Sequence, residues 1–188
     1  MIGLDIILML FLTGLISTLK IKKMEYLTSN WMIGIYIFIG LICFLLLIGK
    51  RSVHSTISIK ATPNQVWEVI TNTAQYNEWN SVMLLREGSI KEGNLVKYRF
   101  TQEEGKQYDI PSRVKKIIPS SLLNQGGGTF GIITFDHKYS LEEKEGKTEL
   151  IIHEDYRGVF VPFWNPAPVK KAYNRLNKDI KNRVESLY

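Results

Sequence analysis

The chain has 188 residues, a formal net charge of +6 and a single cysteine, and its length allows one well-buried domain and an additional segment. The charge is moderate, and basic residues are not interleaved with aromatic ones in any run, which argues against nucleic-acid binding. One cysteine, Cys43, excludes a disulfide within the chain and a cysteine-based metal site. Because Cys43 lies in an apolar run, we interpret it as a small apolar packing residue.

Two apolar stretches occupy the N-terminal part. Residues 2–19 contain one charge, Asp5, and residues 31–49 contain none. At 1.5 Å per residue the second stretch is about 28 Å long, close to the ~30 Å hydrocarbon core of a bilayer. The first stretch has no basic segment before it, which argues against a cleaved signal peptide. We predict two transmembrane helices within an anchor of residues 1–50; one helix with some other N-terminal element is the alternative.

The rest of the chain, residues 51–188, reads as a soluble domain. Three of the 24 basic residues and two of the 18 acidic ones precede position 50, so the chain from Lys50 onward has a net charge of +5. A mildly basic domain held at a bilayer is expected to face anionic headgroups, so membrane lipid is a predicted partner. The numbers of basic residues on the two sides of the predicted spans are nearly equal, so the positive-inside rule hardly favours either orientation. We expect a multi-pass membrane protein whose soluble domain faces the cytoplasm.

The soluble part begins with an alternating stretch, residues 53–61, which predicts a half-buried strand. A short helix should follow, because Thr62 suits an N-cap, proline suits the next position and Gln65 completes a capping box. Trp67 is expected to be buried on its apolar face. Residues 72–80 break this helix and predict a second short helix or turn with Tyr76 and Trp79.

Six more strands are predicted, separated mostly by glycine-containing turns, and short turns between consecutive strands imply an antiparallel meander. The triple glycine at residues 126–128 precedes a strand and not a helix, so we interpret it as a mobile hairpin loop and not as a phosphate cradle. The predicted strands are residues 82–85, 94–102, 106–118, 121–124, 131–142 and 148–160.

The C-terminal segment has apolar residues every three or four positions, which predicts one long amphipathic helix. One helix lying across a curved antiparallel sheet covers one face of that sheet. Its opposite side is basic and could meet anionic headgroups, or it is simply a solvated face. The apolar stripe is Val169, Ala172, Tyr173, Leu176, Ile180, Val184 and Leu187; the basic side includes Lys170, Lys171, Arg175, Lys178, Lys181 and Arg183.

Four stretches resemble the START-like, or SRPBCC, superfamily of polyketide cyclase/dehydrase-like and birch-allergen-like proteins. They are "ISIKATPNQVWEVITNTAQYNEWN" (residues 57–80), "GNLVKYRF", "ELIIHEDYRGVFVP" (residues 149–162) and "AYNRLNKDIKNRVE". The resemblance covers residues 52–188. It implies an α+β helix-grip fold, with a curved antiparallel sheet of about seven strands, two short helices, a long C-terminal helix and a deep cavity for apolar ligands. The two N-terminal spans depart from the commonest architecture of the superfamily.

Two polar residues are candidates for the cavity. His137 lies between Phe135 and Tyr139 on an apolar strand face, so we interpret it mainly as a core or cavity-wall residue, with ligand contact or base catalysis as alternatives. If Glu154 faces the interior it needs a partner, for which Arg157 or Arg113 is available. A zinc motif, a nucleophile elbow and a cysteine near a histidine do not occur in the sequence, so we expect no metal, no cofactor and no nucleophilic catalysis.

These observations support three hypotheses. The first is a membrane-anchored domain that binds a hydrophobic, lipid-like or polycyclic ligand. The second is a cyclase or dehydrase type of enzyme that uses His137 or Glu154 as acid or base, and the third is a scaffold whose cavity its own side chains fill. We expect no catalytic residue with a defined role. The predicted ligand-binding residues are Trp67, Trp79, Tyr98, Phe100, Phe135, His137, Tyr139, Glu154, Tyr156 and Tyr173.

Overall fold

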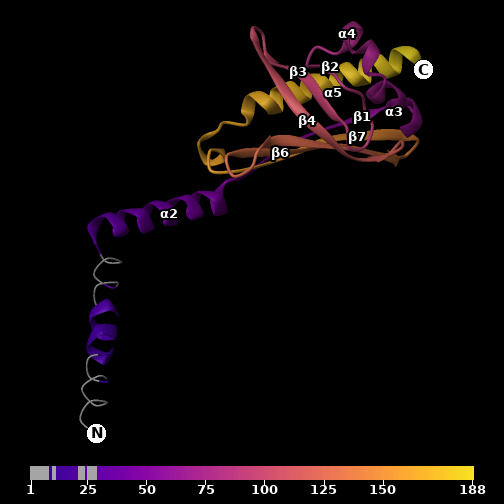
Figure 1. Cartoon of the computed structure of the whole chain (residues 1–188). Helices are drawn as coiled ribbons and strands as arrows, with labels where there is room; N and C mark the ends of the chain where they lie inside the picture. Colours follow the sequence, from indigo (N-terminus) through magenta and orange to yellow (C-terminus); the bar gives the residue numbers. More distant parts are fainter. Residues whose placement is uncertain (1–8, 10–11, 21–23, 25–28) are drawn as a thin grey trace. The chain divides into compact units, whose positions relative to one another are not determined.

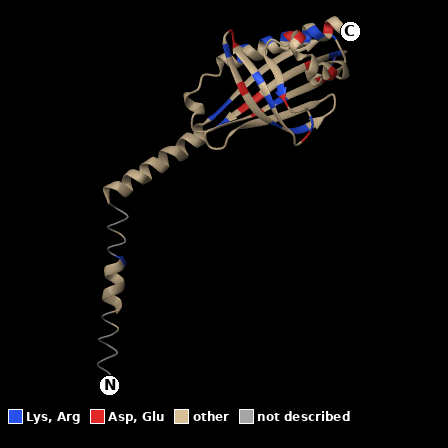
Figure 2. Cartoon of the chain, turned by 45° about the horizontal axis from the view of Figure 1, so that its top comes forward, with Lys and Arg blue, Asp and Glu red and all other residues tan. Residues whose placement is uncertain are grey.

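The computed structural model describes residues 9, 12–20, 24 and 29–188 (Figure 1). The chain divides into two compact units, residues 1–44 and 45–188. Helix α2, Asn30–Ile48, is the one helix within the described residues that is long and apolar enough to cross a membrane. It carries no charged side chain and is uniformly tan in Figure 2. Of the first predicted span, residues 2–8 and 10–11 lie outside the described residues, and residues 12–20 are helical.

The second unit contains one antiparallel sheet of seven strands in the order β1-β7-β6-β5-β4-β3-β2, as the superfamily resemblance implies. Consecutive strands from β2 to β7 are neighbours, which confirms the predicted meander, and β1 closes the other edge against β7. The strands are β1 Lys50–Ile59, β2 Met83–Glu87, β3 Leu95–Glu103, β4 Lys106–Ile118, β5 Leu122–Thr129, β6 Ile133–Lys144 and β7 Lys147–Arg157.

Strand β1 begins three residues before the predicted position, because Lys50, Arg51 and Ser52 already pair with the end of β7. The alternation that marked residues 53–61 does not extend to these three exposed residues, so it gave no sign of the pairing. Only Gly49 therefore lies between the end of α2 and the start of β1.

The triple glycine is part of β5 and not a loop, so that prediction was wrong. Gly126 pairs with Arg113 of β4 and Asp136 of β6. The neighbouring strands approach closely here: a Cβ on Gly127 would lie 2.5 Å from the carbonyl oxygen of Pro111. Glycine thus permits a tight part of the sheet, a use that the sequence does not distinguish from a flexible turn.

The helices match the predicted order. Helix α3, Pro63–Thr71, begins with the predicted capping box of Thr62 and Gln65. The 3₁₀ turn η1, Thr73–Gln75, and helix α4, Tyr76–Trp79, follow. Trp67 packs against the core but is only partly buried, whereas its helix neighbours Val66 and Ile70 are fully buried.

Helix α5, Ala167–Leu187, lies across the concave face of the sheet (Figure 1). The predicted stripe is buried from Val169 to Val184, and only Leu187 at its end is exposed. Between β7 and α5 the chain forms the 3₁₀ turn η2, Val161–Phe163, followed by Trp164. The inward faces of β3 to β7 and the N-terminal half of α5 enclose the site described next.

Candidate functional site

A cavity of about 570 Å³ lies between the N-terminal half of α5 and the concave face of the sheet. Strands β3 to β7 each contribute to its lining, and in β3, β6 and β7 the lining residues alternate along the strand. Most of its surface is apolar. The apolar lining residues are Phe100, Ile110, Pro111, Ile133, Phe135, Trp164 and Val169.

A smaller chamber of about 30 Å³ adjoins the cavity. The two spaces share Phe100, Ile110, Phe135, Glu154 and Tyr173 in their linings, so the chamber is the deeper continuation of the cavity. Its own lining consists of Met83, Tyr98, Ser112, Gln125 and His137, and four of these five side chains carry a polar group, although the surface that they expose to the chamber is almost entirely apolar.

The carboxylate of Glu154 lies where the two spaces meet, and only 4% of the residue is exposed. The hydroxyls of Tyr156 and Tyr173 both donate to its Oε2 atom, and the Nδ1 atom of His137 lies 3.7 Å from its Oε1 atom. A buried carboxylate needs such donors, since burial without them is costly. Burial, together with the neighbouring Glu154 carboxylate, raises the pKa of both tyrosines, so both hydroxyls stay protonated donors at neutral pH.

The arginines that we expected as partners of Glu154 do not contact it. Arg113 is exposed and donates to the carbonyl oxygen of Gly93, and Arg157 is exposed at the end of β7. Their positions follow from strand alternation: Glu154 and Tyr156 face inward, so Arg157 faces outward. We correct the prediction: neutral phenols and an imidazole, not arginines, hold the buried carboxylate.

His137 is almost fully buried in the wall of the deeper chamber. Its ring packs edge-on against Tyr139 at 4.7 Å and Tyr173 at 5.2 Å between centroids. Within the part of the chain that the structure describes, its Nε2 atom has no hydrogen-bond partner. An unpaired buried nitrogen of this kind is uncommon in proteins and calls for an explanation.

A second polar pair lines the same chamber. The side-chain amide of Gln125 donates to the hydroxyl of Tyr98 at 2.9 Å. Burial raises the pKa of Tyr98 to about 12, although the bond from Gln125 acts in the opposite direction. Both residues are neutral at physiological pH, so this end of the site offers hydrogen bonds without a further charge.

Seven of the ten predicted ligand-binding residues line the two spaces: Tyr98, Phe100, Phe135, His137, Glu154, Tyr156 and Tyr173. Tyr139 lies behind His137, with its hydroxyl 3.5 Å from the sulfur of Met83. Trp67 and Trp79 do not line the cavity; both pack against the core from the α3–α4 side.

Several lining residues were not predicted. Strand β4 contributes Ile110 and Ser112, which alternation within the predicted strand could have indicated. Trp164 lies in an irregular segment, where no periodicity assigns a side chain to a face. Its ring packs against Tyr156 at 4.4 Å between centroids, so it covers the outer part of the cavity.

The described residues contain no group of three or more histidine, cysteine, aspartate or glutamate side chains that could hold a metal ion. What the geometry offers is an apolar space with a hydrogen-bonding inner end. Such a site can hold an apolar molecule and orient one polar group of it against Glu154, His137 or the chamber beyond.

The seven-stranded sheet and the long helix that it grips define a helix-grip domain with an internal cavity. Residues 50–185 match the family described as "Polyketide cyclase / dehydrase and lipid transport", and the chain belongs to this family. Curated protein sequences give no match.

Solved structures share the fold at low sequence identity. Ms6760 from Mycobacterium smegmatis superposes with a TM-score of 0.60 at 13% identity, covering 73% of this chain and 92% of its own. TTHA0849 from Thermus thermophilus gives 0.59 at 12% identity and covers 73% and 99%. The protein Ara h 8.0201 gives 0.56 at 14% identity, with the same coverage of 73% and 99%. The matched region corresponds to the domain and leaves the N-terminal segment unmatched by the family.

Proposed function

We propose that this protein is a membrane-anchored binding protein whose cavity accepts a hydrophobic, lipid-like or polycyclic ligand with one polar group. Residues 1–50 form the anchor, which includes α2 and a first span before it, and residues 51–188 form the binding domain. The cavity carries the proposal, because about 570 Å³ of mostly apolar space ends at a hydrogen-bonded carboxylate. This volume lies within the range of sites for small organic ligands.

The inner end suggests how the ligand is oriented. Glu154 Oε2 already receives two phenolic hydrogens, whereas His137 and Tyr98 line the chamber, and the buried Nε2 atom of His137 has no hydrogen-bond partner among the described residues. A hydroxyl or carbonyl of the ligand would bind here, with its apolar body against Phe100, Phe135 and Trp164 in the outer cavity.

The scaffold hypothesis is less favoured, because the side chains leave the cavity open rather than filling it. Membrane attachment is supported by the length and apolar composition of α2. The family description includes lipid transport, which fits a ligand taken from a bilayer.

Native mass spectrometry of the full chain, extracted from its membrane in mild detergent, tests the proposal. We expect a bound small molecule. Ile110→Trp should reduce its occupancy strongly, because the larger side chain occupies the cavity. Leu95→Trp, at a position 65% exposed, is the matched control and should retain the ligand. An adduct that survives Ile110→Trp unchanged, or no adduct in any of the three proteins, would count against the proposal.

Acid–base catalysis by His137 is the second candidate, and the unpartnered Nε2 atom in the cavity wall favours it. Glu154 Oε1, 3.7 Å from the other ring nitrogen, could orient the imidazole. The same mass measurement separates the candidates. If His137 catalyses a dehydration, the molecule recovered from His137→Phe should be heavier by one water than that from the unaltered chain; an identical mass supports binding alone.

A further inference from the structure

Four apolar side chains are exposed at one end of the domain. Phe130 is 95% exposed and Phe163 is 75% exposed, with Ile132 and Phe160 also exposed beside them. We call these four residues the junction surface. Isolated exposed apolar residues are normal in proteins, but a cluster of them marks a place where a protein meets a partner or a membrane.

Backbone hydrogen bonds hold the two loops of the junction surface together. Val159 N donates to Gly131 O at 3.0 Å, and Phe160 N donates to Ile132 O at 3.3 Å. The β5–β6 turn and the segment after β7 are thus one paired unit. Gly158, at a φ of +144°, permits this approach, since a Cβ there would lie 2.2 Å from Ile132 O.

The same unit is bonded to the residue that follows α2. Gly158 N donates to Gly49 O at 3.0 Å, and a Cβ on Gly49 would lie 2.2 Å from Gly158 O. Gly49 directly follows Ile48, the last residue of α2. If α2 crosses the bilayer, chain continuity puts Gly49 at the membrane–water interface, and Gly158 and the junction surface must lie at that interface with it.

Basic residues adjoin this end of the domain. Lys50, Arg51 and Arg157 line a surface depression of about 450 Å³ at the paired ends of β1 and β7, together with Asp155. The nearby carboxylate of Asp155 is bonded to His153 at 3.0 Å. An excess of positive charge beside exposed apolar side chains suits the interfacial region of a bilayer with anionic lipids.

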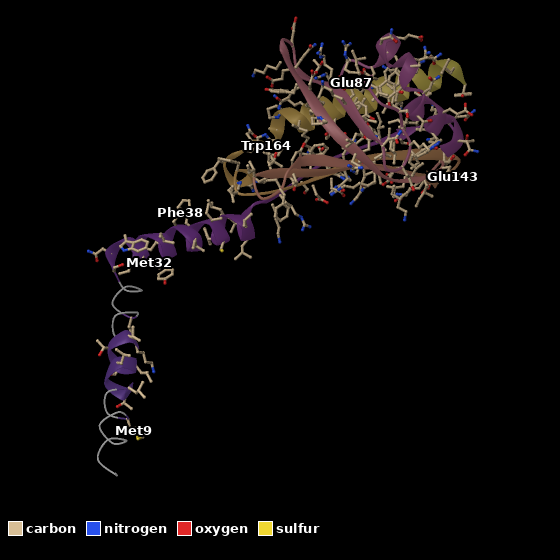
Figure 3. All side chains as sticks on the ribbon, in the orientation of Figure 1. Met9, Met32, Phe38, Glu87, Glu143 and Trp164 are labelled. Carbon is tan, nitrogen blue, oxygen red and sulfur yellow. The ribbon has the colours of Figure 1, made fainter. Side chains whose placement is uncertain are left out.

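The junction surface also borders the ligand cavity. Phe130 and Ile132 lie in the turn between Gly128 and Ile133, both of which line the cavity, and Phe163 directly precedes Trp164, which covers its outer part. Figure 3 shows Trp164 and Glu143 at opposite ends of the domain, and Trp164, Gly128 and Ile133 line the cavity at the end that carries the junction surface.

We infer that the junction surface inserts into the interfacial layer of the bilayer that α2 crosses, and that the cavity exchanges its ligand directly with that bilayer. The inference rests on the proposed anchoring by α2 and names the lipid surface as the partner. It differs from the expectation that the basic side of α5 meets headgroups. Lys181, on that side, donates to Ser58 O, at the end of β1 remote from Lys50.

Site-directed spin labelling of the full chain tests this inference. In a Cys43→Ala background, Phe130→Cys and Phe163→Cys are labelled with a nitroxide, and Glu143→Cys at the opposite end is the matched control. The proteins are reconstituted in phosphatidylcholine vesicles containing phosphatidylserine. At positions 130 and 163 we expect collisions with oxygen, which concentrates in lipid, to exceed those with a water-soluble nickel chelate. The ratio should be several-fold higher than at position 143.

The possible outcomes separate this inference from the proposed function. If the protein floats with the vesicles but the nickel chelate collides with labels at positions 130 and 163 as often as with the label at 143, the inference is wrong and anchoring stands. Dipolar broadening with little access to either reagent would show that a second copy of the chain covers the surface, and would also overturn it. Protein that fails to float with the vesicles contradicts both anchoring and docking. The labels report depth in the bilayer whether or not the cavity holds a ligand, so ligand binding is tested only by the mass measurement.

Discussion

The hydroxyl of Tyr173, on α5, donates a hydrogen bond to the Oε2 atom of Glu154, on β7, inside the cavity between the helix and the sheet. This bond joins the long helix to the sheet at the point where the apolar space ends. Tyr156 donates to the same oxygen from the sheet itself. The pair of phenols satisfies a carboxylate that would otherwise be buried without donors.

Removing these donors should destabilise the protein. We expect Tyr173→Phe to lower the free energy of unfolding by about 1–3 kcal/mol, because one oxygen of a buried carboxylate loses a donor. The double change Tyr156→Phe and Tyr173→Phe should cost more, since only His137 then remains beside Glu154. Thermal unfolding of the full chain in mild detergent, followed by near-ultraviolet circular dichroism, measures the effect.

Tyr108→Phe is the control for these changes. Tyr108 also borders the cavity but is 50% exposed, so its change should alter stability by no more than about 0.5 kcal/mol. Equal effects at positions 108 and 173 would show that the bond to Glu154 contributes nothing specific.

A second prediction concerns alkaline pH. Burial raises the pKa of Tyr98 to about 12 and shifts the pKa of four other buried tyrosines in the same direction. An unfolded tyrosine has a pKa of about 10. The folded pKa is higher than the unfolded one, so this contribution to stability is complete below about pH 10 and is lost as the pH rises through 12. The four others are Tyr76, Tyr139, Tyr156 and Tyr173.

Absorbance at 295 nm measures tyrosinate formation, and circular dichroism on the same samples measures unfolding. We expect these five of the nine tyrosines to ionise only together with the loss of structure. Tyr98→Phe should reduce the slope of stability against pH between 10 and 12. Ionisation of all tyrosines near pH 10 in a protein that stays folded would contradict the burial described here.

How far sequence predicts this fold depends on which interactions are local. Strand alternation placed His137 on an inward face but left the side of Glu154 open, and the capping pattern placed Thr62 and Gln65 correctly, because both patterns depend on neighbouring residues. The partners of Glu154 were missed because Tyr173 is bonded to it through the packing of α5 on the sheet. Charge complementarity suggested arginines, but alternation turns Arg157 outward.

The glycines are a second case in which the local sequence does not record contacts with other strands. The conformational freedom of Gly126–Gly128 suggested a loop, yet these residues are paired on both sides within β5. What requires glycine is the closeness of β4 and β6, which no property of the local sequence records. Trp164 was missed for a related reason, since an irregular segment has no period from which to assign a face.

The third prediction follows from that close approach. Gly127→Ala should destabilise the protein by about 1–3 kcal/mol, because the added Cβ would lie 2.5 Å from the backbone oxygen of Pro111, which cannot move without disturbing β4. Thermal unfolding measures the change. The control is Ser121→Ala, in the β4–β5 turn at the other end of β5, which should be nearly neutral because Ser121 contributes only backbone groups to hydrogen bonds there. An unchanged stability for Gly127→Ala would mean that β5 behaves as the flexible loop that the sequence suggested.

The last prediction concerns where the domain begins. Residues 49–188 should form a cooperatively folded domain without α2, because the sheet and α5 enclose their own core. A fragment of residues 53–188, which starts where alternation first suggests a strand, should be less stable by roughly 2–4 kcal/mol. It loses the ladder bonds around the Lys50–Arg157, Arg51–Tyr156 and Ser52–Asp155 pairs, at about 0.5–1.5 kcal/mol for each bond. It also loses the bond between Gly158 and Gly49. Thermal melts of the two fragments, followed by circular dichroism, give the comparison. If residues 49–188 show no cooperative transition, α2 is part of the fold. If the two fragments melt alike, the first residues of β1 are not needed to hold the end of the domain that we place at the membrane.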